Sequence, residues 1–256
     1  MKAIERAAKL FADINELLIS SGANTRRVER NVERISNALN YHCESFYSHS
    51  AIVLTVQDKA TGEKETIVRT IPHHGVNFSA ISDISILSWE VLEKHLPIEQ
   101  IEKHVATIKA KPHYNMYVMW FFVSVAGGSL AYVFGKDQAS YAEFAMSFIA
   151  TFLGLAGRRI LQLRKFNVYI CWGWAAFVSV SVMSIFRLLG VEHYHNALAA
   201  CVLWLVPGVP LINGFIDMLS GCVVPGVAKL THAAILVFMI SLGFYLALLL
   251  FGYELP

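Results

Sequence analysis

The sequence predicts an α-helical membrane protein, with five transmembrane helices that follow an N-terminal cytoplasmic α+β domain. Only 16% of the 256 residues are charged, whereas a soluble domain usually has about 25%. Residues 1–112 hold most of the Lys, Arg, Asp and Glu, and residues 113–256 are nearly all apolar, aromatic or small. Because these two compositions imply two solvents, we expect an α+β domain over residues 1–112 and a transmembrane domain over residues 113–256.

Charge, cysteine content and the N-terminal segment exclude several classes. The net charge of +2 is too small for a nucleic-acid-binding surface. The four cysteines have no C-x-x-C spacing, so we expect no disulfide framework and no metal or other cofactor. Residues 1–18 mix charged and apolar side chains without a continuous apolar run, which is not the pattern of a signal peptide. The N-terminal domain is therefore expected in the cytoplasm.

The first half of the chain changes from helical to strand periodicity and back. Residues 3–19 have apolar side chains at helical spacing, and a second helix begins near Asn24 or Thr25, both of which are good N-caps. Three strands are expected next, over residues 44–47, 51–57 and 65–71, and then two helices, over residues 78–94 and 98–108. This order predicts a small α+β domain with a meander-like sheet.

Five apolar stretches in the second half each have about the 20 residues that a helix needs to cross a bilayer. They run over residues 116–134, 141–163, 168–189, 197–222 and 232–250. The loops on one side are rich in basic residues, namely Lys109, Lys111, Arg158, Arg159, Arg164, Lys165 and Lys229. That side should be cytoplasmic, which places the N-terminus inside and the C-terminus outside.

The odd number of spans predicts a partner. A second five-span unit would run inverted relative to the first, which is a common plan among transporters. We therefore expect a second five-span membrane subunit, a homo-oligomer, or both, within the lipid bilayer.

The fourth apolar stretch contains the candidate binding residues for a solute. Pro207 and Pro210 lack backbone N–H groups, and they would leave the carbonyls of Leu203 and Val206 without helical partners about 15–20 Å into the bilayer. A helix that restarts at Pro210 would point its N-terminal dipole at that depth, where it suits a carboxylate. Such interrupted helices are typical of transporter binding sites. The predicted substrate-binding residues are Val206, Pro207, Gly208, Pro210, Asn213 and Asp217.

The same residues also allow interpretations in which they bind no substrate. The two prolines could simply kink the helix, which is common in membranes. Asn213 and Asp217 are four residues apart and share one helix face. Asp217 lies about 30 Å along the span, near the cytoplasmic edge, where facing water is the favoured interpretation. A buried Asp217 would instead be a candidate relay for a proton or cation.

Three motifs carry a resemblance to a known family. They are the run Ser21-Gly22-Ala23-Asn24-Thr25 within residues 17–29, then Gly75-Val76-Asn77, then residues 207–213 followed by Asp217 and Ser220-Gly221. In this order the motifs resemble those of the threonine/serine exporter family, over nearly the whole chain. His74 departs from the family, because relatives often carry Arg before the second motif. The resemblance implies export of small polar metabolites across a bacterial inner membrane. A single five-span unit resembles the split form of the family, which includes succinate exporters.

We therefore predict a subunit of a secondary exporter of threonine, serine or a C4-dicarboxylate such as succinate. An ion or proton gradient is the expected energy source, because the chain has no Walker A motif.

Three alternatives are weighed against it. A membrane-anchored hydrolase would draw on Ser20, Ser21, Ser48, Ser50, His49, His73, His74 and Asp83, but no G-x-S-x-G elbow is present. A zinc sensor at Glu192-His193-Tyr194-His195 lacks a fourth ligand. A pure scaffold would pack Pro207 and Pro210 tightly and have no cavity beside Asn213.

Overall fold

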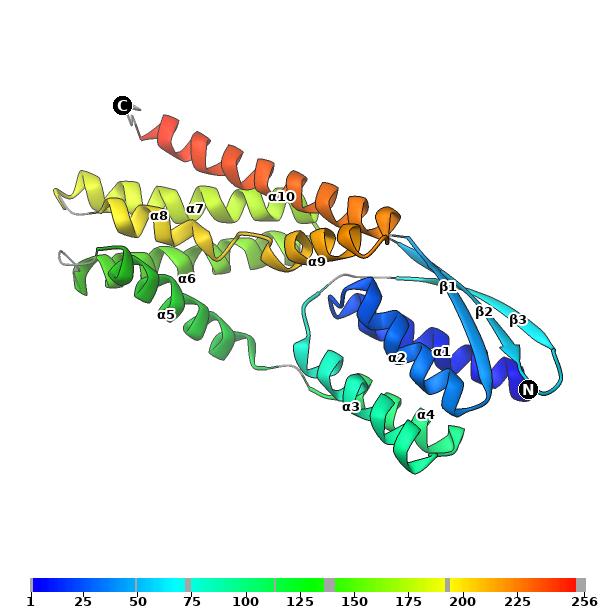
Figure 1. The fold of residues 1–256 in the computed structure, drawn as a ribbon. Coiled ribbons are helices and arrows are strands. Elements are labelled where there is room, and N and C mark those ends of the chain that lie inside the picture. The colour runs from blue at the N-terminus through cyan, green and yellow to red at the C-terminus, as the bar shows by residue number, and fades with distance from the viewer. Residues whose placement is uncertain are drawn as a thin grey trace. The chain divides into compact units, whose positions relative to one another are not determined.

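The computed structural model describes residues 2–48, 50–71, 75–112, 114–135, 141–191 and 194–251. The described chain is mostly helical and has one three-stranded sheet (Figure 1). It forms two compact units. Unit 1 consists of Met1–Pro112 and Gly208–His232, and unit 2 consists of His113–Pro207 and Ala233–Pro256.

Unit 1 contains the predicted α+β elements and, in addition, a helical hairpin from the second half of the chain. Its elements are α1 (Ala3–Ser20), α2 (Thr25–Ala38), β1 (Tyr41–Tyr47), β2 (Ala51–Asp58), β3 (Lys64–Thr70), α3 (Phe78–Lys94), α4 (Ile98–Ala110), α9 (Gly208–Leu219) and the start of α10 (Val223–Leu250). The four helices and three strands predicted for residues 1–112 are confirmed, with β1 beginning three residues earlier than expected.

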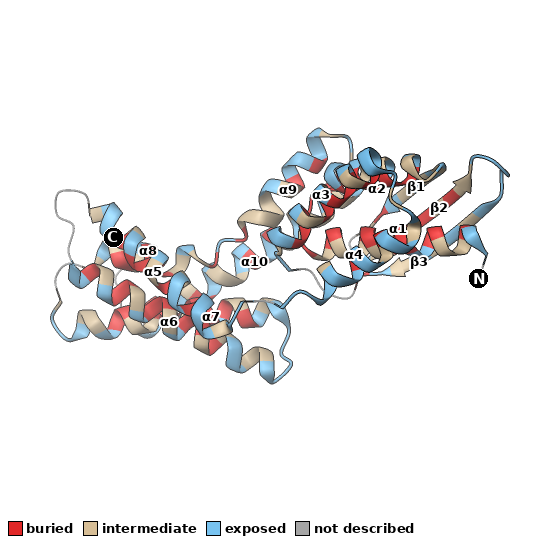
Figure 2. Cartoon of the chain, turned by 90° about the horizontal axis from the view of Figure 1, so that it is seen from below, coloured by how far each residue is buried: buried red, intermediate tan, exposed pale blue. Residues whose placement is uncertain are grey.

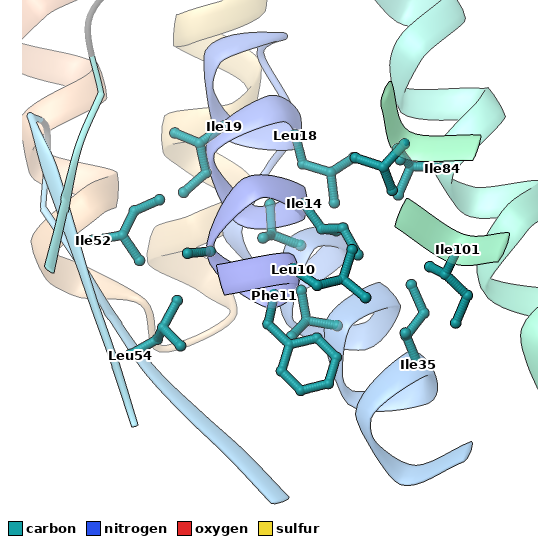
Figure 3. Packing of buried hydrophobic residues seen from close by; sticks show 14 of the residues in the cluster. Leu10, Phe11, Ile14, Leu18, Ile19, Ile35, Ile52, Leu54, Ile84 and Ile101 are labelled. Carbon is teal, nitrogen blue, oxygen red and sulfur yellow. The ribbon is translucent and has the colours of Figure 1, made fainter. Parts of the chain in front are cut away.

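The sheet of unit 1 is an antiparallel meander in the order β1-β2-β3. Every second residue of β2 is buried, as period-2 alternation requires. The side chains of Ile52 and Leu54 point toward α1, and Ile84 of α3 and Ile101 of α4 lie on its other side (Figure 3). α1 is therefore the central helix of this core, which explains why its apolar residues are almost completely buried.

Unit 2 contains α5 (Met116–Gly135), α6 (Tyr141–Leu163), α7 (Val168–Leu188), α8 (His195–Leu203) and the rest of α10. Within the described residues, four helices, α5, α6, α7 and α10, are long and apolar enough to cross a membrane, and α8 with α9, which are bent by 60° at their break, would make a fifth if they form one span. Large apolar side chains such as Phe122 and Leu249 are each 64% exposed, and Figure 2 shows that these helices carry broad exposed faces. Such faces suit lipid rather than water.

Two boundaries in the last third differ from expectation. The fourth apolar stretch is not one helix over residues 197–222, because α8 ends at Leu203 and α9 begins at Gly208. The last helix begins at Val223 rather than at residue 232. Pro225 is its third residue, where a missing N–H leaves no intrahelical bond unmade. Lys229 therefore lies within α10, and Arg158 and Arg159 lie within α6, so the assignment of these three residues to loops is wrong.

The interruption before α9 also differs in one detail from the prediction. The Leu203 carbonyl was expected to lack a helical partner, but it accepts a hydrogen bond from the Val206 N–H at 3.1 Å. A tighter final turn thus satisfies one of the two carbonyls, as often happens at helix ends.

α7 and α10 approach each other closely at two glycines. A Cβ at Gly173 would lie 2.9 Å from the carbonyl oxygen of Met239, and a Cβ at Gly243 would collide with the carbonyl oxygen of Gly173. Small residues that permit such backbone contact are a usual basis of helix packing in membranes.

We expect Gly243→Val to destabilise unit 2 by at least about 1–3 kcal/mol, because the added side chain must displace backbone of α7. The measurement is the thermal unfolding midpoint of the purified full chain in detergent. Ser241→Val is the control, since it places the same side chain at an exposed position of α10. Equal midpoints for the two variants would contradict this packing.

Candidate functional site

The first motif forms the turn between α1 and α2. Gly22 has a φ of 85°, a left-handed conformation that glycine adopts without strain. The Asn24 side chain caps α2 by accepting the Arg27 N–H at 2.8 Å. Thr25 is the first residue of α2, so its N–H has no partner within the helix. The turn thus presents a free helix N-terminus.

The carboxylate of Asp217 in α9 caps the N-terminus of α2. Its Oδ1 accepts the Thr25 N–H at 2.8 Å, and its Oδ2 accepts the Thr25 hydroxyl at 2.9 Å. The ammonium of Lys229 in α10 is 2.6 Å from the same Oδ2 and also donates to the Ala23 carbonyl at 3.3 Å. Asp217 is completely buried and the Lys229 side chain is 19% exposed. The interpretation that Asp217 faces water is therefore wrong.

We name these three residues the Thr25–Asp217–Lys229 cluster. A carboxylate at a helix N-terminus is stabilised by both the N–H donors and the helix dipole. The Lys229 ammonium adds an opposite charge, so the negative charge of Asp217 is compensated despite full burial. The cluster fixes α2, α9 and α10 to one another within unit 1.

Asn213, one turn before Asp217 on α9, makes a second contact with the first motif. Its Nδ2 donates to the Gly22 carbonyl at 2.7 Å. A Cβ at Gly22 would lie 2.9 Å from the Gly75 carbonyl oxygen and 3.5 Å from Val209 Cγ1. Glycine is therefore needed at residue 22 for space as well as for backbone conformation.

The second motif contacts the turn between α1 and α2 through backbone hydrogen bonds. The Gly75 N–H donates to the Ser20 carbonyl at 2.8 Å, and the Asn77 N–H donates to the Ser21 carbonyl at 2.9 Å. The Asn77 side chain then caps α3 by accepting the Ala80 N–H. All three motifs identified in the sequence thus meet around residues 20–25.

Glycines also hold α9 against α10. A Cβ at Gly214 would lie 2.8 Å from Leu230 Cγ and 3.2 Å from the Gly226 carbonyl oxygen, and a Cβ at Gly226 would lie 3.1 Å from the Gly214 carbonyl oxygen. This close backbone approach brings Asp217 and Lys229 within ion-pair distance.

A cavity of about 210 Å³ lies beside Thr25. Its lining includes Glu29, Tyr47, Cys222 and Pro225. Burial raises the pKa of the Glu29 carboxyl, Arg26 opposes that rise, and the negative charge of Asp217 contributes to it. A second acidic group therefore lies close to the cluster, next to solvent-accessible space.

The predicted substrate-binding residues occupy different positions. Asn213 and Asp217 meet the first motif, as described above. Gly208 and Pro210 are half-buried in the first turn of α9, Pro207 is buried just before it, and Val206 is exposed. Binding of a substrate by these six residues stays a prediction.

Thr25 and Lys229 were missed as site residues. Thr25 was interpreted as a helix cap and Lys229 as a loop charge, although the presence of Thr25 in the first motif was a usable signal.

The residues of the alternative sites give them no support. His49, His73, His74, Glu192 and His193 lie outside the described residues. Within the described ranges, no group of three or more His, Cys, Asp or Glu side chains could hold a metal ion.

Apolar helices of membrane-spanning length, together with a buried charged cluster on a helix that follows a break in the chain, are typical of a polytopic membrane transport protein. Residues 9–251 match the ThrE family model, which is described as "Putative threonine/serine exporter". The chain therefore belongs to the threonine/serine exporter family.

Named relatives agree with this class. A protein of Klebsiella aerogenes named "Probable succinate transporter subunit YjjP" is 29% identical over 239 residues, which cover 92% of this chain and 90% of the relative. The protein of the same name from Escherichia coli is 28% identical over 243 residues, with 92% and 91% covered. "Pheromone-regulated membrane protein 10" of Pichia sorbitophila is 22% identical over 94% of this chain but only 24% of its own length. No solved structure matches.

The family match and the two relatives named as transporter subunits show the class of activity. The chain is a membrane transport protein and not an enzyme, so the hydrolase alternative is dropped.

Proposed function

We propose that the chain is one subunit of a secondary exporter of small carboxylate-bearing metabolites in a bacterial inner membrane. The observation that carries the proposal is the contact of Asn213 and Asp217, on the helix after the break, with residues 22–25. The family description and the succinate transporter relatives support threonine, serine or succinate as substrates.

The substrate carboxylate would bind at the start of α9. This helix begins at Gly208, directly after the interruption. First-turn N–H groups lack partners within a helix and carry the positive end of its dipole. Pro210 is the third helical residue, so it costs no hydrogen bond there. The Val206 carbonyl, this first turn and Asn213 would together line the path.

The first motif would act as the inner gate. The Asn213 amide donates to Gly22 in the structure, so the same N–H group cannot hold a substrate until the motif moves. The Thr25–Asp217–Lys229 cluster would stabilise the closed arrangement, and its buried carboxylate is a candidate relay for the coupling proton or cation. Transport would then require the cluster to open and re-form in each cycle.

The membrane arrangement belongs to the same proposal. It has five spans over residues 113–256, a cytoplasmic domain over residues 1–112, an inner N-terminus and an outer C-terminus. A second five-span subunit would supply the inverted half. The word "subunit" in the names of the two YjjP relatives supports such a partner.

The test is metabolite efflux from cells that express this chain with and without a five-span partner subunit. We expect succinate, threonine or serine to leave the cells only when both are present, and collapse of the ion gradient to stop it. Efflux by this chain alone would mean that self-association suffices. If no carboxylate metabolite leaves under any condition, the proposed function is wrong.

We expect Thr25→Val to loosen the inner gate. The variant removes the hydroxyl that donates to Asp217 and keeps the backbone N–H bond. Loss of a hydrogen bond to a charged group should cost about 1.5–3 kcal/mol. The measurement is hydrogen exchange at residues 22–28, which should speed up. In Thr107→Val, which removes a hydroxyl on the exposed face of α4, exchange there should not change. Unchanged exchange in Thr25→Val would contradict the gate.

A further inference from the structure

Among the buried hydrogen-bond donors of unit 2 that have no partner, three belong to neutral side chains on or beside α6. They are the hydroxyls of Ser124 in α5 and Thr151 in α6, and the indole N–H of Trp204, which follows α8. None of these atoms has a partner among the residues that the structure describes. Ser124 and Thr151 are completely buried. Unpaired polar groups are costly inside a membrane, so each one requires an explanation.

Two of the donors lie in the contact between α5 and α6 and the third lies one turn further along α6, and we name the set the α5–α6 seam. A Cβ at Gly127 would lie 2.6 Å from Thr151 Oγ1, so Thr151 faces α5. Ser124 is three residues before Gly127 and shares its helix face. Gly154, three residues after Thr151, lies between α7 and the Trp204 ring, because a Cβ there would be 3.2 Å from the Ala175 carbonyl oxygen and 3.3 Å from Trp204 Cζ2. α8 itself packs on both α5 and α6.

Neighbouring hydroxyls in the same unit do find partners. Ser147 donates to the Gly127 carbonyl at 3.0 Å, Ser179 to the Ala150 carbonyl at 3.2 Å, and Ser184 to the Val180 carbonyl at 2.9 Å. Backbone carbonyls can therefore satisfy hydroxyls in this bundle. A lack of acceptors in the bundle therefore does not explain why the donors of the seam have no partner.

The chemistry of the three groups indicates what would bind. An indole N–H only donates, and a hydroxyl always has a proton to donate. Hydroxyl and indole groups carry no charge, so the three groups are neutral donors. Neutral donors in apolar surroundings suit an anion with several acceptor oxygens that must later leave. A carboxylate has this chemistry.

We infer that Ser124, Thr151 and Trp204 form a second station for the carboxylate of the exported metabolite. This inference rests on the proposed function, since it concerns the same substrate class. Trp204 is four residues before Gly208 in the chain, so one broken stretch contributes both to this station and to the start of α9.

The test combines efflux with a direct binding signal. Thr151→Val keeps the side-chain shape and removes the hydroxyl, Ser124→Ala removes the other hydroxyl, and Trp204→Phe removes the N–H. We expect each variant to raise the half-saturating succinate concentration for efflux about tenfold or more, as loss of a hydrogen bond to a charged group does. In lipid nanodiscs, succinate should change the tryptophan fluorescence of the wild-type chain and not that of Trp204→Phe. Thr151→Ser keeps a hydroxyl and should restore efflux.

Two matched variants control for packing. Ser184→Ala removes a buried hydroxyl of unit 2 that has a partner. Ser181→Ala removes one that has no partner but points about 200° away from Ser179, which faces α6. Both should keep wild-type half-saturation. If the seam variants also keep it while the wild type exports succinate, the station is refuted and the proposed function stands. If the wild type exports no carboxylate metabolite, both are refuted.

Discussion

Asp217→Ala is expected to be among the most destabilising substitutions in the chain. It removes the acceptor of the Thr25 N–H, the Thr25 hydroxyl and the Lys229 ammonium together. Removal of one partner of a buried ion pair costs about 3–5 kcal/mol, because the other charge is left uncompensated. Lys229 would be left as that charge, with its side chain only 19% exposed. The measurement is the thermal unfolding midpoint of the purified full chain, together with the amount in the membrane fraction.

Two further variants make this result specific. Glu90→Ala breaks the Glu90–Lys94 pair, whose side chains are 37% and 61% exposed. It should change the midpoint little, because exposed pairs contribute little. The double variant Asp217→Leu with Lys229→Met removes both charges. It should be more stable than Asp217→Ala alone, because no uncompensated charge remains. If the double variant is as unstable as the single one, the ion pair is not what stabilises α9 against α10.

Even a stable double variant should fail to export. Its fold would no longer need the carboxylate, but the proposed gate would lack the group that opens and closes it. If the double variant exports at the wild-type rate, the cluster has only a structural role and its proposed role in transport is refuted.

The spacing of apolar residues was enough to predict most helices and strands. The helices and strands of residues 1–112 follow from apolar spacing and from caps such as Asn24, since these signals lie within a few residues of each other. The helix over Tyr141–Leu163 was predicted to the residue because charged and polar residues flank it. The early start of α10 was missed because Lys229 was interpreted as a loop residue, although neither it nor Pro225 in the first turn prevents a helix.

The candidate site was only partly predictable because its contacts are long-range. Asn213 and Asp217 were singled out from their spacing after the prolines, but 192 residues separate Thr25 from Asp217. No local pattern can report such a pair. The sequence does hold a weak signal, since both residues lie in motifs of one family. Ser124 and Thr151 carry no signal at all, because small polar residues are ordinary in membrane helices.

Asn213→Leu is expected to reduce efflux by about 100-fold, to the background of cells without the chain. The substitution keeps the side-chain size and removes an amide that donates to Gly22 and that we propose also meets the substrate. A hydrogen bond to a charged group is worth about 1.5–3 kcal/mol, or about 10- to 100-fold, and the lost gate contact should add to this. The measurement is the initial rate of succinate, threonine or serine efflux in the presence of the partner subunit.

Membrane insertion is the deciding control for that variant. Asn213 is only half-buried, and leucine is favoured in a span, so the amount of chain in the membrane should match the wild type. Phe215→Leu changes an exposed side chain two residues later on α9 and should leave efflux unaffected. Normal efflux from Asn213→Leu would remove Asn213 from both the path and the gate. Loss of efflux in both variants would indicate that α9 tolerates no change, and not that the amide binds a solute.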